Sequence, residues 1–341
     1  MNVSSKNSLD FLRLTAALFV LYSHQYALLG LAEPSFFGWN SFGGAGVTVF
    51  FFLSGMLVWL SWARDPNLRR FFQRRSLRIF PALWVIVLIT IFVLGPILTT
   101  VSLPEYFRSN DTWRYLTTAM LFPRNILPGV FEKNPYPYAV NGSLWTLPVE
   151  YLCYLMVAVV GSIWQRWRLV GPALTLIAAA LLATYAPIIV GDRFSPHFEM
   201  IAIFWWGALY GYSTASPRGH FQDRYWLIGS IIAAALIFSL LGSRGTERMA
   251  MLLCAAMSVV LAQRTNFGAR LTDRLGDLSY GIYIYAFPVQ QVLIYWSRDA
   301  GLSFGLLFFL SVVITFVLAY FSWHLIEYQA LRLKPRARAA T

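Results

Sequence analysis

The chain has 341 residues, of which 58% are hydrophobic and 12% charged, and its mean hydropathy is +0.57. This composition excludes an ordinary soluble protein and leaves little sequence for a large additional globular domain. The net charge of +12 would suggest a nucleic-acid ligand in a soluble protein. The two cysteines, Cys153 and Cys254, lie inside apolar runs, so the sequence supports neither a disulfide framework nor a cysteine-based metal site.

The apolar segments predict an all-α fold, a polytopic transmembrane helical bundle that forms a single domain over residues 1–341. About 20 apolar residues cross a bilayer as a helix, and the sequence contains about ten such segments. They cover residues 9–31, 47–62, 79–98, 147–164, 169–190, 198–212, 225–241, 249–262, 279–296 and 302–325. The sixth and eighth segments are short, and their length also suits buried or re-entrant helices.

The distribution of Lys and Arg between alternate loops predicts the orientation of the bundle. With both termini in the cytoplasm, the cytoplasmic side collects most basic residues, including the arginine run 64–78 and the short basic tail 332–341. This asymmetry explains the positive net charge, so we expect a lipid bilayer and no nucleic acid as partner. A cleavable signal peptide is the competing interpretation of the N-terminus, but Asp10, Arg13 and His24 interrupt its apolar run.

The only long predicted connection, residues 99–146, lies on the external side and is rich in aromatic residues and proline. We expect it to fold back on the membrane surface. Its aromatic side chains suit stacking on sugar rings and suit the interfacial aromatic belt equally well.

Arg13 and His24 lie in the first predicted span. About three helical turns, ~16 Å of rise, separate them, so both side chains lie on nearly the same helix face. Arg13 could extend to the cytoplasmic interface and His24 could lie at the external one. Alternatively, the two residues form one polar track along the helix, because an ionisable residue at membrane depth usually faces a cavity or a partner. A neutral imidazole can accept a proton from a hydroxyl group.

The arginine run 69–78 precedes the third predicted span. It could be a flank that is attracted to anionic lipids. However, Arg75 and Arg78 are three residues apart on a predicted helix and therefore share a face. Arginine binds phosphate oxygens in a planar, bidentate manner, so this pair indicates a phosphorylated cytoplasmic ligand.

Two further segments carry polar or small residues at span ends. The glycine-rich segment 43–55 permits tight turns and close backbone approach, and Ser54 with Gly55 predicts a helix-packing surface. In the segment 141–151, Pro148 fits a first helical turn and Glu150 lies near the level expected for His24. Glu150 could orient or charge-stabilise the imidazole, or it could be a carboxylate favoured at a helix start.

The last candidates lie near the C-terminus. Tyr280 follows the segment 275–279 at the start of the ninth predicted span, where tyrosines usually belong to the interfacial belt. His324 and Glu327 are a possible i, i+3 pair, but they make a poor metal site without further ligands. We therefore predict no metal.

Together these segments resemble the membrane acyltransferases of acyltransferase family 3, over nearly the whole chain. The family opening, an arginine followed by a histidine, is similar to residues 9–13 with His24. Residues 46–55 resemble its Gly-Val-x-x-Phe-Phe-x-x-Ser-Gly segment, with Thr48 where many members have Asp. Arg75 to Arg78 resembles its Arg-x-x-Arg motif. Residues 143–150, which include Trp145, and residues 275–280 resemble its two later blocks.

The resemblance implies transfer of an acyl group, commonly acetyl from acetyl-CoA, to a hydroxyl of a saccharide or glycolipid of the bacterial cell envelope. We therefore expect that His24 is the general base, that Glu150 orients it or balances its charge, and that Arg75 and Arg78, with help from Arg13, hold the acyl-CoA. Residues with a structural or site role would be Ser54, Gly55, Trp145, Tyr280 and Glu327.

Two other functions remain open from the residues. A transporter or flippase of glycolipid intermediates could use Arg13, His24 and Glu150 to line a substrate path, although the sequence lacks the internal repeats that are common in transporters. A non-catalytic membrane subunit or sensor is the third possibility.

Overall fold

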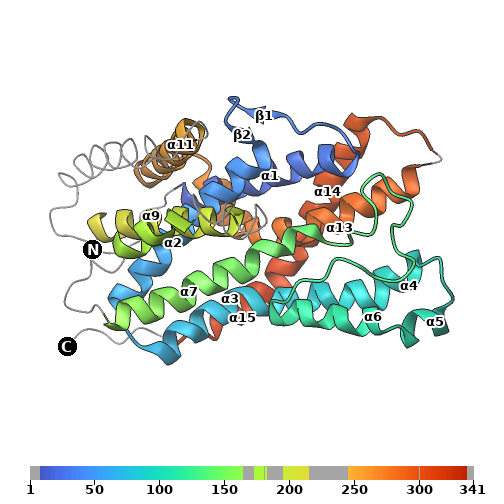
Figure 1. Cartoon of the computed structure of the whole chain (residues 1–341), viewed down its shortest axis with the longest axis horizontal. Coiled ribbons are helices and arrows are strands. Elements are labelled where there is room, and N and C mark those ends of the chain that lie inside the picture. Colours follow the sequence, from blue (N-terminus) through green and yellow to red (C-terminus); the bar gives the residue numbers. More distant parts are fainter. Residues whose placement is uncertain are drawn as a thin grey trace.

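A computed structural model of the chain describes residues 8–163, 173–179, 181–182, 195–214, 245–298 and 300–335, and most of them are helical (Figure 1). The first half contains α1 (Leu9–Leu28), β1 (Ser35–Phe36), β2 (Asn40–Ser41), α2 (Phe42–Arg64), α3 (Leu68–Ile89), the π-helical turn η1 (Thr90–Leu94), α4 (Gly95–Leu98), α5 (Leu103–Arg108), α6 (Asn110–Arg114), η2 (Tyr115–Met120) and η3 (Gly142–Trp145). The second half contains α7 (Thr146–Ile163), α9 (Ser195–Thr214), α11 (Gly245–Arg264), α12 (Ala269–Leu275), α13 (Ser279–Ser297), α14 (Phe304–Ser322), the π-helical turn η5 (Trp323–Glu327) and α15 (Tyr328–Arg332). Strands β1 and β2 form one short antiparallel hairpin.

Four helical stretches of the described residues are long and apolar enough to cross a membrane. They are Phe42–Arg64, Leu68–Leu98, Gly142–Ile163 and Phe304–Arg332, and a fifth results if the bent pair Glu247–Arg264 and Ala269–Leu275 counts as one span. Helices α1, α9 and α13 match predicted spans and have 19 or 20 residues. They are less apolar than these stretches. Helix α1 carries the buried Gln25, and α13 carries the buried Gln290 and Gln291.

The segments predicted as short spans have ordinary helix lengths. Residues 198–212 belong to α9 and residues 249–262 to α11, each of which has 20 residues. Of the fifth predicted span, 169–190, the described residues 173–179 and 181–182 are helical. The seventh, 225–241, lies outside the described residues.

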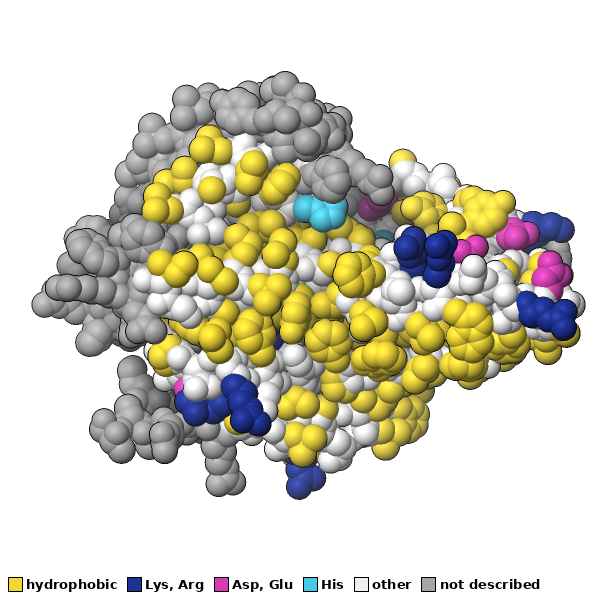
Figure 2. Space-filling view, turned by 60° about the horizontal axis from the view of Figure 1, so that its bottom comes forward, with side chains coloured by type: hydrophobic (Ala, Val, Ile, Leu, Met, Phe, Trp, Pro, Cys, Tyr) yellow, Lys and Arg dark blue, Asp and Glu magenta, His cyan; other side chains and the backbone are white. Residues whose placement is uncertain are grey.

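Helix α14 has the inverted polarity of a lipid-facing helix. Its buried residues are small or polar at nearly every fourth position, as in Ser311, Thr315 and Ala319, whereas large apolar side chains such as Phe309 and Phe321 are exposed. Small residues allow close helix packing in a membrane, and exposed apolar side chains contact lipid. The face in Figure 2 likewise carries many hydrophobic side chains and few charged ones. The chain is therefore a membrane protein.

The arginine run belongs to helix α3 itself, which starts before the third predicted span. The Asn67 side chain accepts a hydrogen bond from the Arg70 amide at 3.0 Å and caps the helix. Asp65, which is buried in the α2–α3 turn, accepts hydrogen bonds from Arg70 at 2.9 and 2.5 Å and from Arg74 at 2.7 Å. These two guanidinium groups hold the pKa of Asp65 well below its usual range. Asp65 therefore fixes the turn that sets the start of α3.

The glycines of helix α2 allow neighbouring backbones to approach closely and do not form a turn. Gly43 and Gly46 lie inside the helix, which starts at Phe42. A Cβ atom at Gly46 would collide with the Ala16 carbonyl of α1, and one at Gly55 would collide with the Phe204 carbonyl of α9. Gly55 thus lies where the backbone of α2 approaches that of α9.

The connection 99–146 packs partly against the helices. Its helices α5 and α6 gather with the preceding α4 at one end of the bundle (Figure 1). Farther along, Asn134 donates to the Gln291 side chain of α13 at 2.8 Å, and Gln291 donates to the Ala139 carbonyl at 2.7 Å. These contacts join the connection to α13 shortly before η3 and α7 begin.

We predict that Gly55→Ala destabilises the protein by about 1–3 kcal/mol or more, because the added methyl group meets backbone that cannot move aside. Gly305→Ala on α14 is the matched control, since a Cβ atom there meets nothing within 4 Å. Thermal unfolding in detergent should show a clear drop in Tm for the first variant alone. Equal melting temperatures would contradict the packing role of Gly55.

Candidate active site

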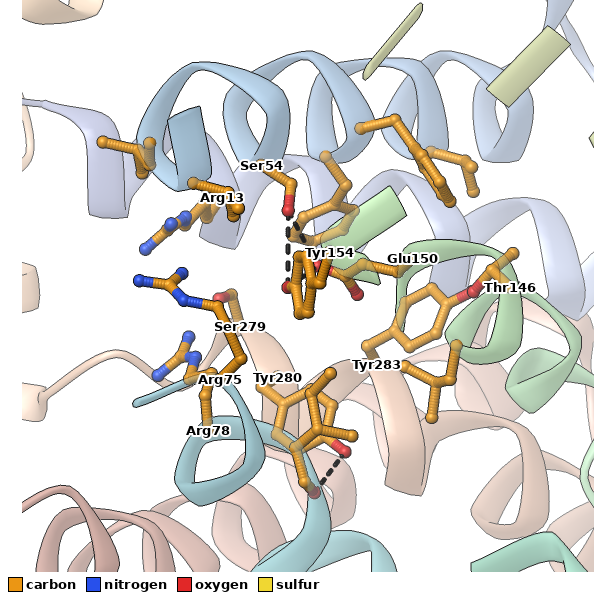
Figure 3. A pocket seen from close by; sticks show the side chains of 17 residues that line it. Arg13, Ser54, Arg75, Arg78, Thr146, Glu150, Tyr154, Ser279, Tyr280 and Tyr283 are labelled. Carbon is orange, nitrogen blue, oxygen red and sulfur yellow. Dashed lines mark hydrogen bonds between the residues drawn. The ribbon is translucent and has the colours of Figure 1, made fainter. Parts of the chain in front are cut away.

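A cavity of about 110 Å³ lies between α1, α2, α3, α7 and α13 (Figure 3). Three arginines mark one end of it, and Thr146 and Tyr283 mark the other. The lining residues are Arg13, Val47, Phe50, Phe51, Ser54, Leu57, Val58, Arg75, Arg78, Ile79, Thr146, Leu147, Glu150, Tyr154, Ser279, Tyr280 and Tyr283. The cavity thus brings together six of the ten site residues selected from the sequence, and leaves out the other four, His24, Gly55, Trp145 and Glu327.

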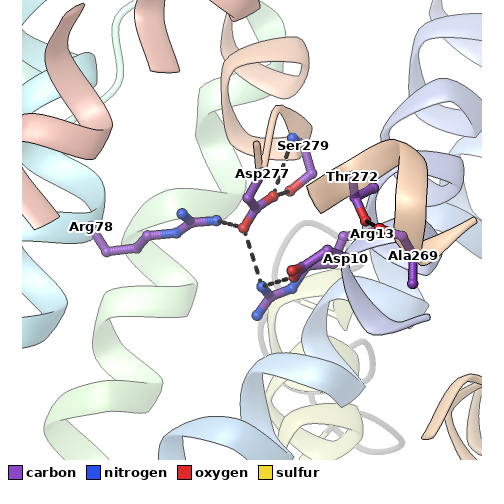
Figure 4. A network of polar contacts seen from close by, with 7 residues as sticks. All are labelled: Asp10, Arg13, Arg78, Ala269, Thr272, Asp277 and Ser279. Atoms are coloured by element: carbon purple, nitrogen blue, oxygen red, sulfur yellow. Dashed lines mark hydrogen bonds and ion pairs between the residues drawn. The ribbon is translucent and has the colours of Figure 1, made fainter. Parts of the chain in front are cut away.

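The arginine end of the cavity is organised by one carboxylate, Asp277, in the turn between α12 and α13 (Figure 4). Arg78 of α3 donates to Asp277 Oδ2 at 2.5 Å, and Arg13 of α1 donates to the same oxygen at 3.3 Å. Arg13 also donates to Asp10 at 3.3 Å, and Ser279 donates to Asp277 Oδ1 at 2.5 Å. Burial would raise the pKa of Asp277, but the charges of Arg78 and Arg13 hold it well below its usual range. Asp277 is thus a shared anion between three helices.

Arg75 differs from its neighbours because no carboxylate pairs with it in the part of the chain that the structure describes. Its Nη2 donates to Ser61 at 3.2 Å, and its guanidinium lies 6.0 Å from the Phe71 ring and 5.8 Å from the Tyr154 ring. Its Nε is buried without a hydrogen-bond partner. Arg75 therefore keeps donors available for an anionic ligand.

A fourth cation lies near the same end. Lys334 follows α15 directly, and α15 packs against α3. Burial and the charges of Arg78, Arg75 and Arg13 lower the pKa of Lys334 to about 8. The combined positive charge of these residues favours an anion at this end of the cavity.

Glu150 occupies the middle of the cavity wall and is held from α2 and α7. Ser54 donates to Glu150 Oε1 at 2.9 Å, and Tyr154, one turn further along α7, donates to the same oxygen at 2.5 Å. Ser54 thus has a polar partner in addition to the packing surface predicted for it. Pro148 lies in the first turn of α7, as expected.

The other end of the cavity is closed by contacts between α13 and the start of α7. The hydroxyl groups of Tyr283 and Thr146 are 2.6 Å apart, and Tyr283 donates to the Ser143 carbonyl at 2.9 Å. Tyr280, one turn earlier on α13, donates to the Ile79 carbonyl at 2.8 Å. Trp145 points elsewhere: its ring lies 5.3 Å from His197.

His24 lies beyond this closed end. Its ring is 5.3 Å from Phe287, one turn after Tyr283 on α13, and its Nδ1 is buried without a partner. Within the described residues, no hydrogen bond or ion pair joins His24 to Glu150. Glu150 instead bonds to Ser54 and Tyr154, because its side chain faces α2 at this point of the bundle.

Glu327 is buried in the π-helical turn η5, where Ser322 donates to its Oε1 at 3.0 Å. His324 lies 4.3 Å from the ring of Tyr320. No ion pair between His324 and Glu327 occurs in the described structure. No group of three or more His, Cys, Asp or Glu that could hold a metal ion was found among the described residues.

Sequence reasoning missed Asp277, Tyr154, Tyr283 and Lys334 as parts of this site. Asp277 lies in the segment 275–280 that was singled out, and it is the only carboxylate there. Asp277 could have been predicted as part of the site, since the arginines selected from the sequence require an anionic partner in a membrane. Lys334 was used only to predict the orientation of the bundle. Nothing in the sequence distinguishes Tyr154 and Tyr283 from other tyrosines of apolar helices.

Comparisons with known proteins agree with the residue patterns. A family model described as an acyltransferase domain matches residues 6–324. The chain is 32% identical over 332 residues to an O-acetyl transferase of Shigella phage Sf6, which covers 94% of this chain and 95% of that protein. It is 29% identical to Nodulation protein 10 of Rhizobium leguminosarum bv. viciae, over 96% of this chain and 94% of that protein. It is 27% identical to the exopolysaccharide production protein ExoZ of Rhizobium meliloti, over 77% and 80% of the two chains. No solved structure matches the chain.

We predict that Asp277→Asn lowers stability by about 3 kcal/mol, because it leaves Arg13 and Arg78 without their shared anion in a buried place. Asp10→Asn is the matched control: the Asp10 side chain is 52% exposed, against 10% for Asp277, and an exposed pair contributes at most about 1 kcal/mol. Thermal unfolding of both variants tests the difference. Similar Tm values would show that Asp277 does not organise the arginines.

Proposed function

The chain belongs to the acyltransferase family and is an enzyme of the O-acetyltransferase type, and from this premise we propose its donor, acceptor and mechanism. The donor is acyl-CoA, with acetyl as the acyl group, bound from the cytoplasm. The acceptor is a hydroxyl group of a saccharide or glycolipid of the cell envelope. The observation that carries the proposal is the cavity with an unpaired arginine at one end and a histidine beyond the other.

Arg75 is the main ligand of the donor phosphates. Its free guanidinium donors suit the planar, bidentate geometry of phosphate binding. Arg13, Arg78 and Lys334 add positive charge, while Asp277 keeps the first two in place. The acyl arm then extends along the cavity past Glu150 toward Tyr283. Glu150, with its two donors, belongs to the wall along this path.

The chemical step takes place at His24. The imidazole accepts the proton of the acceptor hydroxyl, and the oxygen attacks the thioester carbonyl carbon. The C–O bond forms, the C–S bond breaks, and the thiolate of CoA leaves and takes up a proton. For the thioester to meet His24, it must pass the contact between Thr146 and Tyr283, because Phe287 and His24 lie one turn beyond that contact on α13.

The topology that fits this proposal has about ten spans with both termini in the cytoplasm, in the cytoplasmic membrane of a bacterium. It is supported by the excess of basic residues in alternate loops and by the lipid-facing polarity of α14. In this orientation the arginine end of the cavity faces the cytoplasm, where acyl-CoA is made.

We predict that His24→Ala reduces transfer by about 10²–10⁴-fold, the usual range for a lost general base. Purified protein in vesicles is incubated with acetyl-CoA labelled in its acetyl group and with membrane saccharides, and label in the saccharide is measured. His324→Ala, whose ring packs on Tyr320, is the matched control and should keep its activity.

Wild-type rates in the His24 variant would remove the histidine from the mechanism. Movement of an unmodified glycolipid across the vesicle membrane, without labelling, would instead support a transporter or flippase.

We predict that Arg75→Ala weakens acyl-CoA binding by about 10–100-fold, the effect of losing hydrogen bonds to a charged group, and leaves Tm nearly unchanged. Arg78→Ala should weaken binding and also lower Tm, because Asp277 then loses its closest charged partner. Arg69→Ala, at an exposed position of α3, serves as control. Binding is measured by calorimetry with CoA; unchanged affinity in the Arg75 variant would return the arginine run to a purely topological role.

A further inference from the structure

Glu33 lies in the loop between α1 and β1 and extends inward from an exposed position. The residue is exposed, yet its carboxylate Oε2 accepts a hydrogen bond from Ser23 Oγ, and Ser23 is fully buried. Gly43 of α2 lies directly against Ser23, where a larger residue would collide with the hydroxyl. The carboxylate is therefore fixed at a defined point beside α1.

Ser23, which holds the carboxylate, directly precedes His24 in the helix. Glu33 is near enough to His24 to act on it electrostatically. The His24 Nδ1 is buried and has no partner. An imidazolium formed there would be a buried cation, and such a cation is costly without a nearby anion.

The other groups around His24 do not supply this anion. On the described elements packed against α1, the titratable residues near this level are tyrosines that already have partners. Tyr22 and Tyr26 bond to each other, Tyr283 bonds to Thr146 and Ser143, and Tyr136 packs on Phe287. Helix α2 presents glycine and phenylalanine here, and α14 presents Phe304 and Phe308. Glu150 bonds to Ser54 and Tyr154.

We propose that Glu33 is the positioning residue of His24, a role that rests on the proposed function of His24 as general base. When the imidazole takes the proton of the acceptor hydroxyl, the Glu33 carboxylate stabilises the resulting imidazolium. Ser23 holds the carboxylate in place. This is the arrangement of a base supported by a third group, as in catalytic triads, with the support coming from an external loop.

The first test is a titration that does not depend on activity. The ring signals of His24 are followed by NMR in detergent with isotope-labelled histidine, and are assigned by their loss in His24→Ala. In Glu33→Gln the titration midpoint should move to lower pH by about 0.5–1 unit, because the imidazolium loses its neighbouring anion. Glu132→Gln, an exposed carboxylate of the external connection, should leave the midpoint unchanged.

The second test is the pH dependence of kcat. Glu33→Gln should reduce the plateau rate about ten-fold and shift the acidic limb to lower pH, in the same direction as the titration. Glu33→Asp should recover part of both effects, and Ser23→Ala should show a smaller change of the same kind. Thermal unfolding checks that the variants are folded.

Three outcomes are distinguishable. An unchanged midpoint and pH profile in Glu33→Gln, with or without a lower rate, would overturn the role of Glu33, since a merely structural loss does not move either. If His24→Ala is inactive in that case, only the assignment of Glu33 fails. If His24→Ala keeps wild-type activity, the proposed function of His24 fails, whatever the titration shows.

Discussion

The ion pairs of Asp277 with Arg13 and Arg78 are the interaction on which the site depends. A guanidinium group at membrane depth is costly unless it meets an anion or water. One carboxylate meets two of them, and it joins α1, α3 and the turn before α13 at a single point. Since these three elements also form walls of the cavity, the contact that neutralises the charges also sets the shape of the arginine end.

Neutralisation is selective, and this selectivity separates structural arginines from a binding one. Asp65 pairs with Arg70 and Arg74, and Asp277 pairs with Arg78. Arg75 lies between these residues in the same helix without a carboxylate in the described structure, and with aromatic rings beside it. A run of basic residues that resembles a membrane flank thus contains a partly buried cation, Arg75, that no carboxylate of the described residues neutralises.

The sequence predicts features that depend on neighbouring residues and misses those that depend on the rotation of helices. Arg75 and Arg78 share a face because helical periodicity is local, and Gly55 packs on α9 because a glycine surface suits close approach. The partner of Glu150 could not be predicted, because its level in the membrane leaves open whether it faces α1 or α2. The contact of Arg78 with Asp277 spans 199 positions of the chain, and no local pattern encodes it.

Helix α13 relates the two ends of the site to each other. Tyr280, Tyr283 and Phe287 follow one another at helical spacing and contact, in turn, α3, the start of α7, and His24. In the proposed mechanism the phosphates of CoA stay at the arginine end and the saccharide stays outside. Only the acyl arm passes Tyr283. The free-energy cost of moving a phosphate through the bilayer core is far higher than that of moving a neutral thioester, because an unpaired charge loses its hydration in a low-dielectric medium. A site with fixed cations at one end and a histidine at the other therefore avoids transporting either polar substrate.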